Sequence, residues 1–270
     1  VFVINYLGGM WQAAKNWSPA ILTALALILI WEFVVWFLDI QRWLLPPPTI
    51  IFQELIDSTG LLARHAGITL VEIIMGFAVS LMIGVALASG IVWSRTMERS
   101  VYPIIIASQT IPIFTLAPLL IIWVGTDIFS KVIVVVLFTF FPLVVSLVTG
   151  LRSVDSESVD MFRTLGATNA QIFRKLMIPT ALPNFFAGMK VAAVVSVIGA
   201  VIGEWVGASA GLGWLMKLSG PQFQTARVFA AIVVLSVVAI TLFSVIVAIE
   251  KWSLRKYPSI LNQAKNLGDS

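Results

Sequence analysis

SVDSESVDMFRTLGATNAQIFRKLMIPTALP, residues Ser153–Pro183, is the longest polar interval in a chain of 270 residues that is otherwise mostly apolar. Its spacing predicts two short helices around a glycine. Asp155 stands near the start of the first helix, where the helix dipole favours negative charge. Gly166 follows that helix as a left-handed capping residue should, and Thr168 with Gln171 fits a capping box at the start of the second.

Both arms of this hairpin carry apolar side chains at helical spacing. Pro179 and Pro183 are expected to break the second helix and to lead into the next membrane segment. A hairpin this small cannot bury two apolar stripes by itself, so the pattern indicates a partner. The stripes comprise Val159, Phe162 and Leu165 in the first arm and Ile172, Phe173, Leu176 and Met177 in the second.

The composition is that of an integral membrane protein, with 59% hydrophobic and 11% charged residues and a mean hydropathy of +1.01. The chain has no cysteine and one histidine, His65, which excludes disulfides and thiolate or multi-histidine metal sites. Gly211-Leu212-Gly213 lacks the ending of a phosphate-binding loop, so no nucleotide site is predicted and the glycines are expected to form turns of an external re-entrant segment. The scattered acids and single histidine also argue against an intramembrane enzyme.

Six segments are long and apolar enough to cross a bilayer, which takes about 20 residues per helix. We therefore predict an all-α polytopic membrane protein with six transmembrane helices, in which the 153–183 hairpin joins spans four and five. Residues 1–18 are expected to form an interfacial N-terminal segment, residues 19–250 the transmembrane domain and residues 251–270 a cytoplasmic tail. Thr49–Leu62 is interpreted as a short surface helix. The spans are Pro19–Leu38, Gly67–Trp93, Pro103–Val124, Ile128–Thr149, Asn184–Trp205 and Ala226–Glu250.

The distribution of Lys and Arg predicts the orientation. With the N-terminus in the cytoplasm, twelve of the 17 basic residues fall on the inner side of the membrane and five on the outer side. Because cytoplasmic loops are enriched in Lys and Arg, this arrangement is favoured. It places both termini and the polar hairpin in the cytoplasm.

Polar side chains and prolines interrupt span three, at Gln109, Thr110, Pro112 and Pro118. Helix breakers at membrane depth are tolerated where the backbone is buried in protein or lines a water-filled cavity. We expect this helix to line a pathway; the alternative is a kinked helix that packs internally.

Span five carries Gly199 and Gly203, a spacing of small residues that lets helices approach closely, and then Glu204. An acid within a membrane is costly and usually faces a cavity or a partner. Glu204 is therefore expected to meet either a polar substrate or a basic residue, and Glu72 in span two is similar. Possible partners of Glu72 are Arg64 and Lys131.

The hairpin resembles the cytoplasmic EAA loop of ABC importer permeases, which reads Glu-Ala-Ala, three residues, Gly, nine residues and Ile-x-Leu-Pro. Asp160-Met161-Phe162 stands at the first triplet and keeps only its acid, whereas Gly166 and Pro179 match outright. In that family the loop docks in a groove of the ATPase subunit. The resemblance thus implies ATPase-coupling roles for Asp160, Phe162, Arg163, Gly166, Ala167, Phe173, Leu176 and Pro179.

The resemblance extends over most of the chain. The phrases LPPPTIIFQEL, ASQTIPIFTLAPLLIIW, SVIGAVIGEWVGASAGLG and FQTARVFAAIVVLS are similar to the branch that imports nitrate, taurine, alkanesulfonates, thiamine-pyrimidine precursors and riboflavin. It implies a homodimer in the bacterial inner membrane, with an extracytoplasmic binding protein and two ATPase subunits that bind the ATP and Mg²⁺. The chain itself would be no enzyme, would hold no cofactor and would work by alternating access.

The cargo suggested by this resemblance is a thiamine-pyrimidine precursor or a riboflavin-like heterocycle, with nitrate, taurine or an alkanesulfonate as the alternative. No Arg or Lys lies in the middle of a span, where an anion pathway would need one. A more remote alternative is an ATP-independent carrier or channel, but the internal repeats of carriers are not evident and the hairpin would have no role. The candidate pathway residues are Gln109, Thr110, Pro112, Trp123, Glu204 and Trp205.

Overall fold

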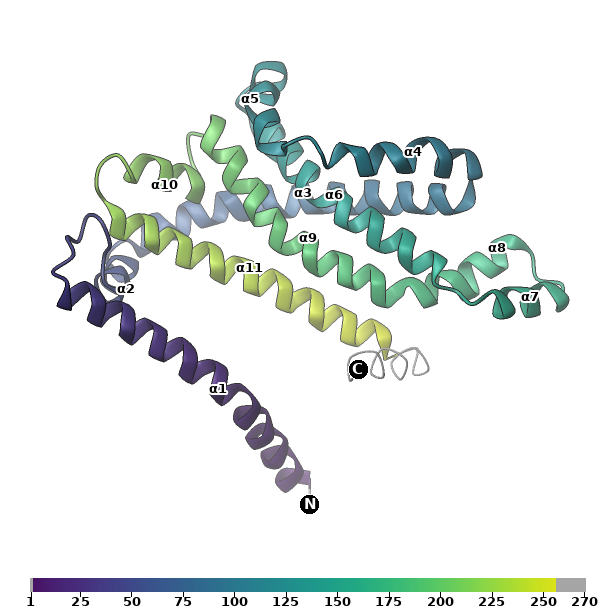
Figure 1. Cartoon of the computed structure of the whole chain (residues 1–270), viewed down its shortest axis with the longest axis horizontal. Helices are drawn as coiled ribbons and strands as arrows, with labels where there is room; N and C mark the ends of the chain where they lie inside the picture. The colour runs from purple at the N-terminus through teal and green to yellow at the C-terminus, as the bar shows by residue number, and fades with distance from the viewer. Residues whose placement is uncertain (1, 256–270) are drawn as a thin grey trace. The chain divides into compact units, whose positions relative to one another are not determined.

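The computed structural model describes the backbone of residues 2–255 and the side chains of residues 18–255. All regular elements among these residues are helices (Figure 1). Their bounds are α1 Phe2–Phe37, α2 Pro48–Asp57, α3 Thr59–Trp93, α4 Arg95–Ser108, α5 Ile113–Val124, α6 Ile128–Arg152, α7 Ser156–Thr164, α8 Asn169–Ile172, the π-helical turn η1 Phe173–Met177, α9 Ile178–Gly207, α10 Leu212–Ser219 and α11 Thr225–Leu254.

Five helices in the described residues are long and apolar enough to cross a membrane, and the count is six if α4 and α5 together form one broken span. This confirms the predicted all-α polytopic fold. The helix α1 runs on without interruption at residue 18, and the interfacial role of residues 1–18 stays a prediction because their side chains are outside the described set. Of the predicted tail 251–270, residues 256–270 also lie outside it.

The described residues divide into two compact units, residues 2–62 with 216–232 and residues 63–215 with 233–255. In the first unit, Glu32 accepts hydrogen bonds from the backbone N–H and the hydroxyl of Thr49, at 3.1 and 2.8 Å. Arg227 forms an ion pair with Glu54 at 2.8 Å. These contacts join α1, α2 and the start of α11 within that unit.

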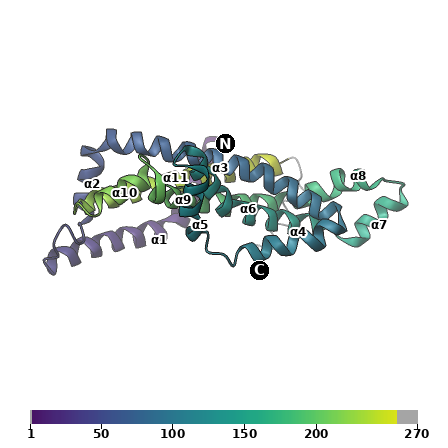
Figure 2. The same ribbon diagram turned by 90° about the horizontal axis from the view of Figure 1, so that it is seen from above.

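The second unit is built on the antiparallel pair α6 and α9, which lie side by side along most of their lengths (Figures 1 and 2). Glycines on α9 permit this approach. A Cβ at Gly199 would lie 3.0 Å from the Cα of Val135, and one at Gly188 would lie 2.6 Å from the Cβ of Ser146. Small residues let helix backbones pack closely in a membrane. The expected role of Gly199 is therefore confirmed.

Span three differs from the single helix expected over 103–124. It consists of α4 and α5, which meet at an angle of 99° across residues 109–112. Pro112 lacks a backbone N–H and serves as the N-cap of α5. The hydroxyls of Ser108 and Thr110 donate to the carbonyls of Ile105 and Ala107, at 2.7 and 2.8 Å. These local bonds compete with a continuous helix, so the chain breaks here instead of kinking.

The expectation that Pro179 and Pro183 break the helix was wrong, because both lie inside a continuous helical run from α8 through η1 to α9. Pro179 occupies the first turn of α9, directly after the π-helical turn. There the N–H of Ile178 donates to the carbonyl of Phe173, five residues earlier. This wider turn accommodates a residue that has no N–H to donate. The surface helix is also shorter than expected: α2 ends at Asp57, and α3 already begins at Thr59.

Replacing Gly188 with Ala should destabilise the protein by about 1–3 kcal/mol, because its Cβ would overpack the contact with Ser146 on α6. Gly67→Ala is the matched control, since a Cβ there meets no atom within 4 Å. Thermal unfolding in detergent micelles, followed by size-exclusion chromatography, measures both variants. Equal melting temperatures for the two would contradict a close α6–α9 contact.

Candidate functional site

The first arm of the polar hairpin is capped at both ends by the predicted residues. The side chain of Asp155 accepts hydrogen bonds from the N–H groups of Glu157 and Ser158, both at 3.3 Å. At the other end Gly166 has φ +78°, and its N–H donates to the carbonyl of Arg163 at 2.9 Å. The N–H of the next residue donates back to Phe162, which completes a Schellman cap. Residue 166 therefore requires a glycine.

The second arm is fixed by the predicted capping box. The N–H of Thr168 donates to the side chain of Gln171 at 2.8 Å, and the N–H of Gln171 donates to the Thr168 hydroxyl at 3.3 Å. From this cap the helix runs through η1 into α9 with no break. Figures 1 and 2 show α7 and α8 beyond the ends of α6 and α9. The second arm of the hairpin and α9 are thus one continuous helical run.

The end of the hairpin presents apolar side chains outward. Met161 and Leu165 are 56% and 76% exposed. Beside them Asp160 and Arg163 form an exposed ion pair at 3.2 Å. An exposed apolar pair with a charged rim is typical of a surface that contacts another protein.

The predicted coupling residues do not all share this end. Asp160, Arg163 and Gly166 are exposed there, whereas Phe162 and Ala167 are half-buried. Phe173 packs edge-on against Trp93, with ring centroids 5.7 Å apart. Leu176 and Pro179 are half-buried in the helical run that leads into the membrane. Sequence periodicity identified the apolar stripes but could not tell the outward side chains from those that pack on α3.

Glu204 stands at the centre of a second, fully buried site. Its relative exposure is 0%, and one carboxyl oxygen accepts a hydrogen bond from the Thr69 hydroxyl at 2.6 Å. The other oxygen accepts from the N–H groups of Gly213 and Trp214, at 2.5 and 3.4 Å. Both oxygens are therefore occupied by groups of the protein itself.

The first four N–H groups at the start of α10 all have acceptors, and Glu204 is the acceptor for two of them. The Gly211 N–H donates to Nδ1 of His65 at 3.0 Å, and the Leu212 N–H donates to the Thr69 hydroxyl at 2.9 Å. Gly211 has φ +111°, and a Cβ at this position would collide with the Glu204 carboxyl. The first N–H groups of a helix have no partner within it. Three side chains of α3 and α9 accept all four bonds, and the glycines form a turn around them.

The other residues predicted to line the pathway lie outside the buried site around Glu204. Gln109, Thr110 and Pro112 are exposed at the α4–α5 break, and Trp123 on α5 is 69% exposed. Trp205 is 46% exposed and follows the buried Glu204. Glu72 is 3% exposed, and its buried Oε2 has no hydrogen-bond partner in the described part of the chain. Within the described residues it forms no ion pair with Arg64 or Lys131; the Lys131 ammonium donates to the carbonyls of Thr126 and Asp127.

Substitution of Glu204 by Leu should cost about 3 kcal/mol or more, because it leaves the Thr69 hydroxyl and two buried N–H groups without an acceptor. Glu204→Gln keeps an acceptor oxygen and the side-chain shape, and should lose less. Thermal unfolding in micelles gives the stability, and hydrogen exchange of residues 211–215 reports the turn. A Leu variant with native stability and protected amides would show that the network is not needed.

Residues 80–255 match the family described as "Binding-protein-dependent transport system inner membrane component". The formylaminopyrimidine transport permease protein of Halalkalibacterium halodurans is 41% identical over 84% of this chain and 90% of its own length. The riboflavin transport system permease protein of Chloroflexus aurantiacus is 32% identical, over 86% of this chain and 88% of its own. A solved inward-facing structure of the MetNI methionine ABC transporter is similar in fold, with TM-score 0.59 and 21% identity over 72% of this chain and 97% of that one.

Proposed function

The chain belongs to the family of binding-protein-dependent transport system inner membrane components, the permease subunits of ABC importers, and we propose that its cargo is a thiamine-pyrimidine precursor or a related heterocycle. The observation that carries this proposal is the 41% identity, over most of both chains, with a formylaminopyrimidine permease. The riboflavin permease at 32% identity supports the same class of flat, nitrogen-rich cargo.

In this proposal two copies of the chain enclose the pathway, with both termini and the hairpin in the cytoplasm. Two ATPase subunits bind ATP and Mg²⁺ on the cytoplasmic side, and a binding protein delivers the cargo on the other. The exposed Met161 and Leu165 enter a groove of the ATPase, and the Asp160–Arg163 pair lies at its rim. Burial of two such side chains contributes a few kcal/mol of contact energy.

Movement of the ATPase reaches the pathway through the helical run from α8 to α9. Because α9 packs closely on α6 through its glycines, the two helices shift as one body. ATP binding and hydrolysis would alternate the access of the pathway between the two sides. The Schellman cap and the capping box make the hairpin rigid enough to transmit this motion.

The α4–α5 break is proposed to contact the cargo. Its exposed Gln109 and Thr110 offer the amide and hydroxyl groups that hydrogen-bond a heterocycle, and Trp123 and Trp205 offer aromatic faces for stacking. Glu204 serves this pathway at a distance, since its carboxyl holds the turn before α10. Its contribution is to position that turn.

Single cysteines at Met161 or Leu165 should crosslink to the partner ATPase subunit in membranes, because these side chains are exposed at the end of the hairpin. The chain has no cysteine of its own, so each variant carries one thiol. Phe173→Cys is the matched control, since Phe173 packs against Trp93, and it should crosslink weakly. Labelling of residues 161 and 165 by an impermeant reagent from outside intact cells would contradict the orientation.

Proteoliposomes that contain this chain, its ATPase and its binding protein should take up labelled formylaminopyrimidine in an ATP-dependent manner. Taurine should not be transported, and uptake of taurine alone would overturn the proposed cargo.

Gly166→Val tests whether uptake depends on the hairpin. The variant should insert into the membrane normally but should lose ATP-dependent uptake, because a β-branched residue at φ +78° is strained by about 1–2 kcal/mol. A Cβ there meets no atom within 4 Å, so a loss would report the backbone conformation and not a clash.

A further inference from the structure

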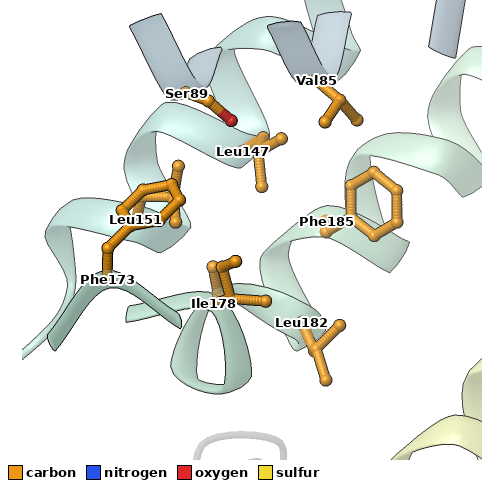
Figure 3. Close-up of a pocket in the computed structure, with 9 residues that line it drawn as sticks. Val85, Ser89, Leu147, Leu151, Phe173, Ile178, Leu182 and Phe185 are labelled. Atoms are coloured by element: carbon orange, nitrogen blue, oxygen red, sulfur yellow. The ribbon is translucent and has the colours of Figure 1, made fainter. Parts of the chain in front are cut away.

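An apolar cavity lies where the hairpin joins the membrane helices, between α3, α6 and the start of α9 (Figure 3). Its volume is about 150 Å³. Among its nine lining residues Ser89 contributes the one hydroxyl. A cavity with so apolar a lining favours an apolar guest. The apolar wall includes Leu147, Leu151, Ile178, Leu182 and Phe185.

A second cavity of about 490 Å³ shares the lining residue Phe173 with it, and three of its nine lining residues are polar, two of them arginines. Arg95 comes from the first turn of α4, and Arg163 and Asn169 come from the two arms of the hairpin. Arg95 forms no ion pair with a carboxylate in the described part of the chain. The ion pair of Arg163 with Asp160 is exposed, and such pairs contribute little to stability. Two guanidinium groups and a side-chain amide therefore favour an anion in this cavity.

The two cavities meet at one shared lining residue. Phe173 lines both of them. On α3, Val85 and Ser89 line the apolar cavity, and Val92, on the same helix face, lines the basic one. Trp93, the last residue of this membrane-spanning helix, also lines the basic cavity, and tryptophan is enriched at the level of lipid headgroups.

The apolar cavity is open to the outside of the chain between α3 and α9. Val85 and Ile178, which line it from α3 and α9, remain 39% and 40% exposed. A hydrocarbon chain can enter laterally between these two helices. The arrangement offers a basic site for an anionic headgroup beside Trp93, and an apolar slot along α3 for a hydrocarbon chain.

We propose that the paired cavities bind one anionic phospholipid, with its phosphate against Arg95 and Arg163 and part of an acyl chain in the apolar slot. A free phosphate would use the basic cavity and leave the slot empty. The bound lipid would lie against Phe173, whose ring contacts Trp93, and would brace the hairpin against α3. The coupling element would then depend on lipid composition, a property beyond the transport function proposed above.

Native mass spectrometry of the purified chain in detergent tests this lipid site directly. The probes are phosphatidylglycerol and phosphatidylcholine with identical acyl chains. The wild-type chain should retain phosphatidylglycerol preferentially, and Arg95→Gln should weaken that retention by roughly tenfold, since a charge-assisted hydrogen bond is lost. Arg99→Gln is the matched control: Arg99 is also exposed on α4 but does not line either cavity, so retention should stay unchanged.

Two further measurements separate a lipid from a free anion. Val85→Trp, which fills the mouth of the apolar slot, should reduce retention of phosphatidylglycerol while Arg95 remains in place. Excess inorganic phosphate should compete poorly with the lipid. Equal retention of both lipids, equal effects of the two arginine substitutions, or full displacement by phosphate with no effect of Val85→Trp would each overturn the proposal.

Discussion

Backbone polar groups that a helix leaves without a partner have to be hydrogen-bonded elsewhere, and this constraint accounts for three irregular points of the larger unit. At the start of α10, side chains of His65, Thr69 and Glu204 accept four N–H groups that the helix itself cannot satisfy. At the α4–α5 break, hydroxyls bond the neighbouring carbonyls. Before Pro179, a π-helical turn rearranges the ladder around a missing donor. At the break and at the π-helical turn the partners are close in the chain, whereas at α10 two of the three acceptor side chains come from α3.

The close packing of α6 and α9 connects two of these irregular points, the π-helical turn and the start of α10. Gly188 and Gly199 bring α9 to within van der Waals distance of α6, and neither position has room for a side chain. One end of α9 continues into the hairpin, and its other end holds Glu204 and the turn before α10. A single rigid helix thus connects the surface proposed to receive energy with the turn that Glu204 positions.

The hairpin itself combines local rigidity with an unburied apolar surface. Its caps are formed by short-range bonds and need no partner to persist. Leu165, by contrast, is 76% exposed, and exposed apolar side chains on a rigid element favour contact with another protein. Phe173 instead packs onto Trp93 of α3, so the same short segment both exposes apolar side chains and packs against a long apolar helix.

The sequence by itself determined the membrane class, the caps of the hairpin and the glycine at residue 166, because these depend on composition and on contacts between residues close in the chain. It also marked Gln109–Pro112 as irregular, but only the tertiary structure decided that the helix breaks there with a 99° bend. Glu204 shows the difference most clearly. Sequence reasoning weighed a substrate against a basic residue as its partner, whereas the folded chain brings Thr69 and the start of α10 to its two oxygens. Thr69 and Glu204 are 135 residues apart in the chain, and they meet only because α3 and α9 pack together. A pattern of neighbouring residues cannot predict such a contact.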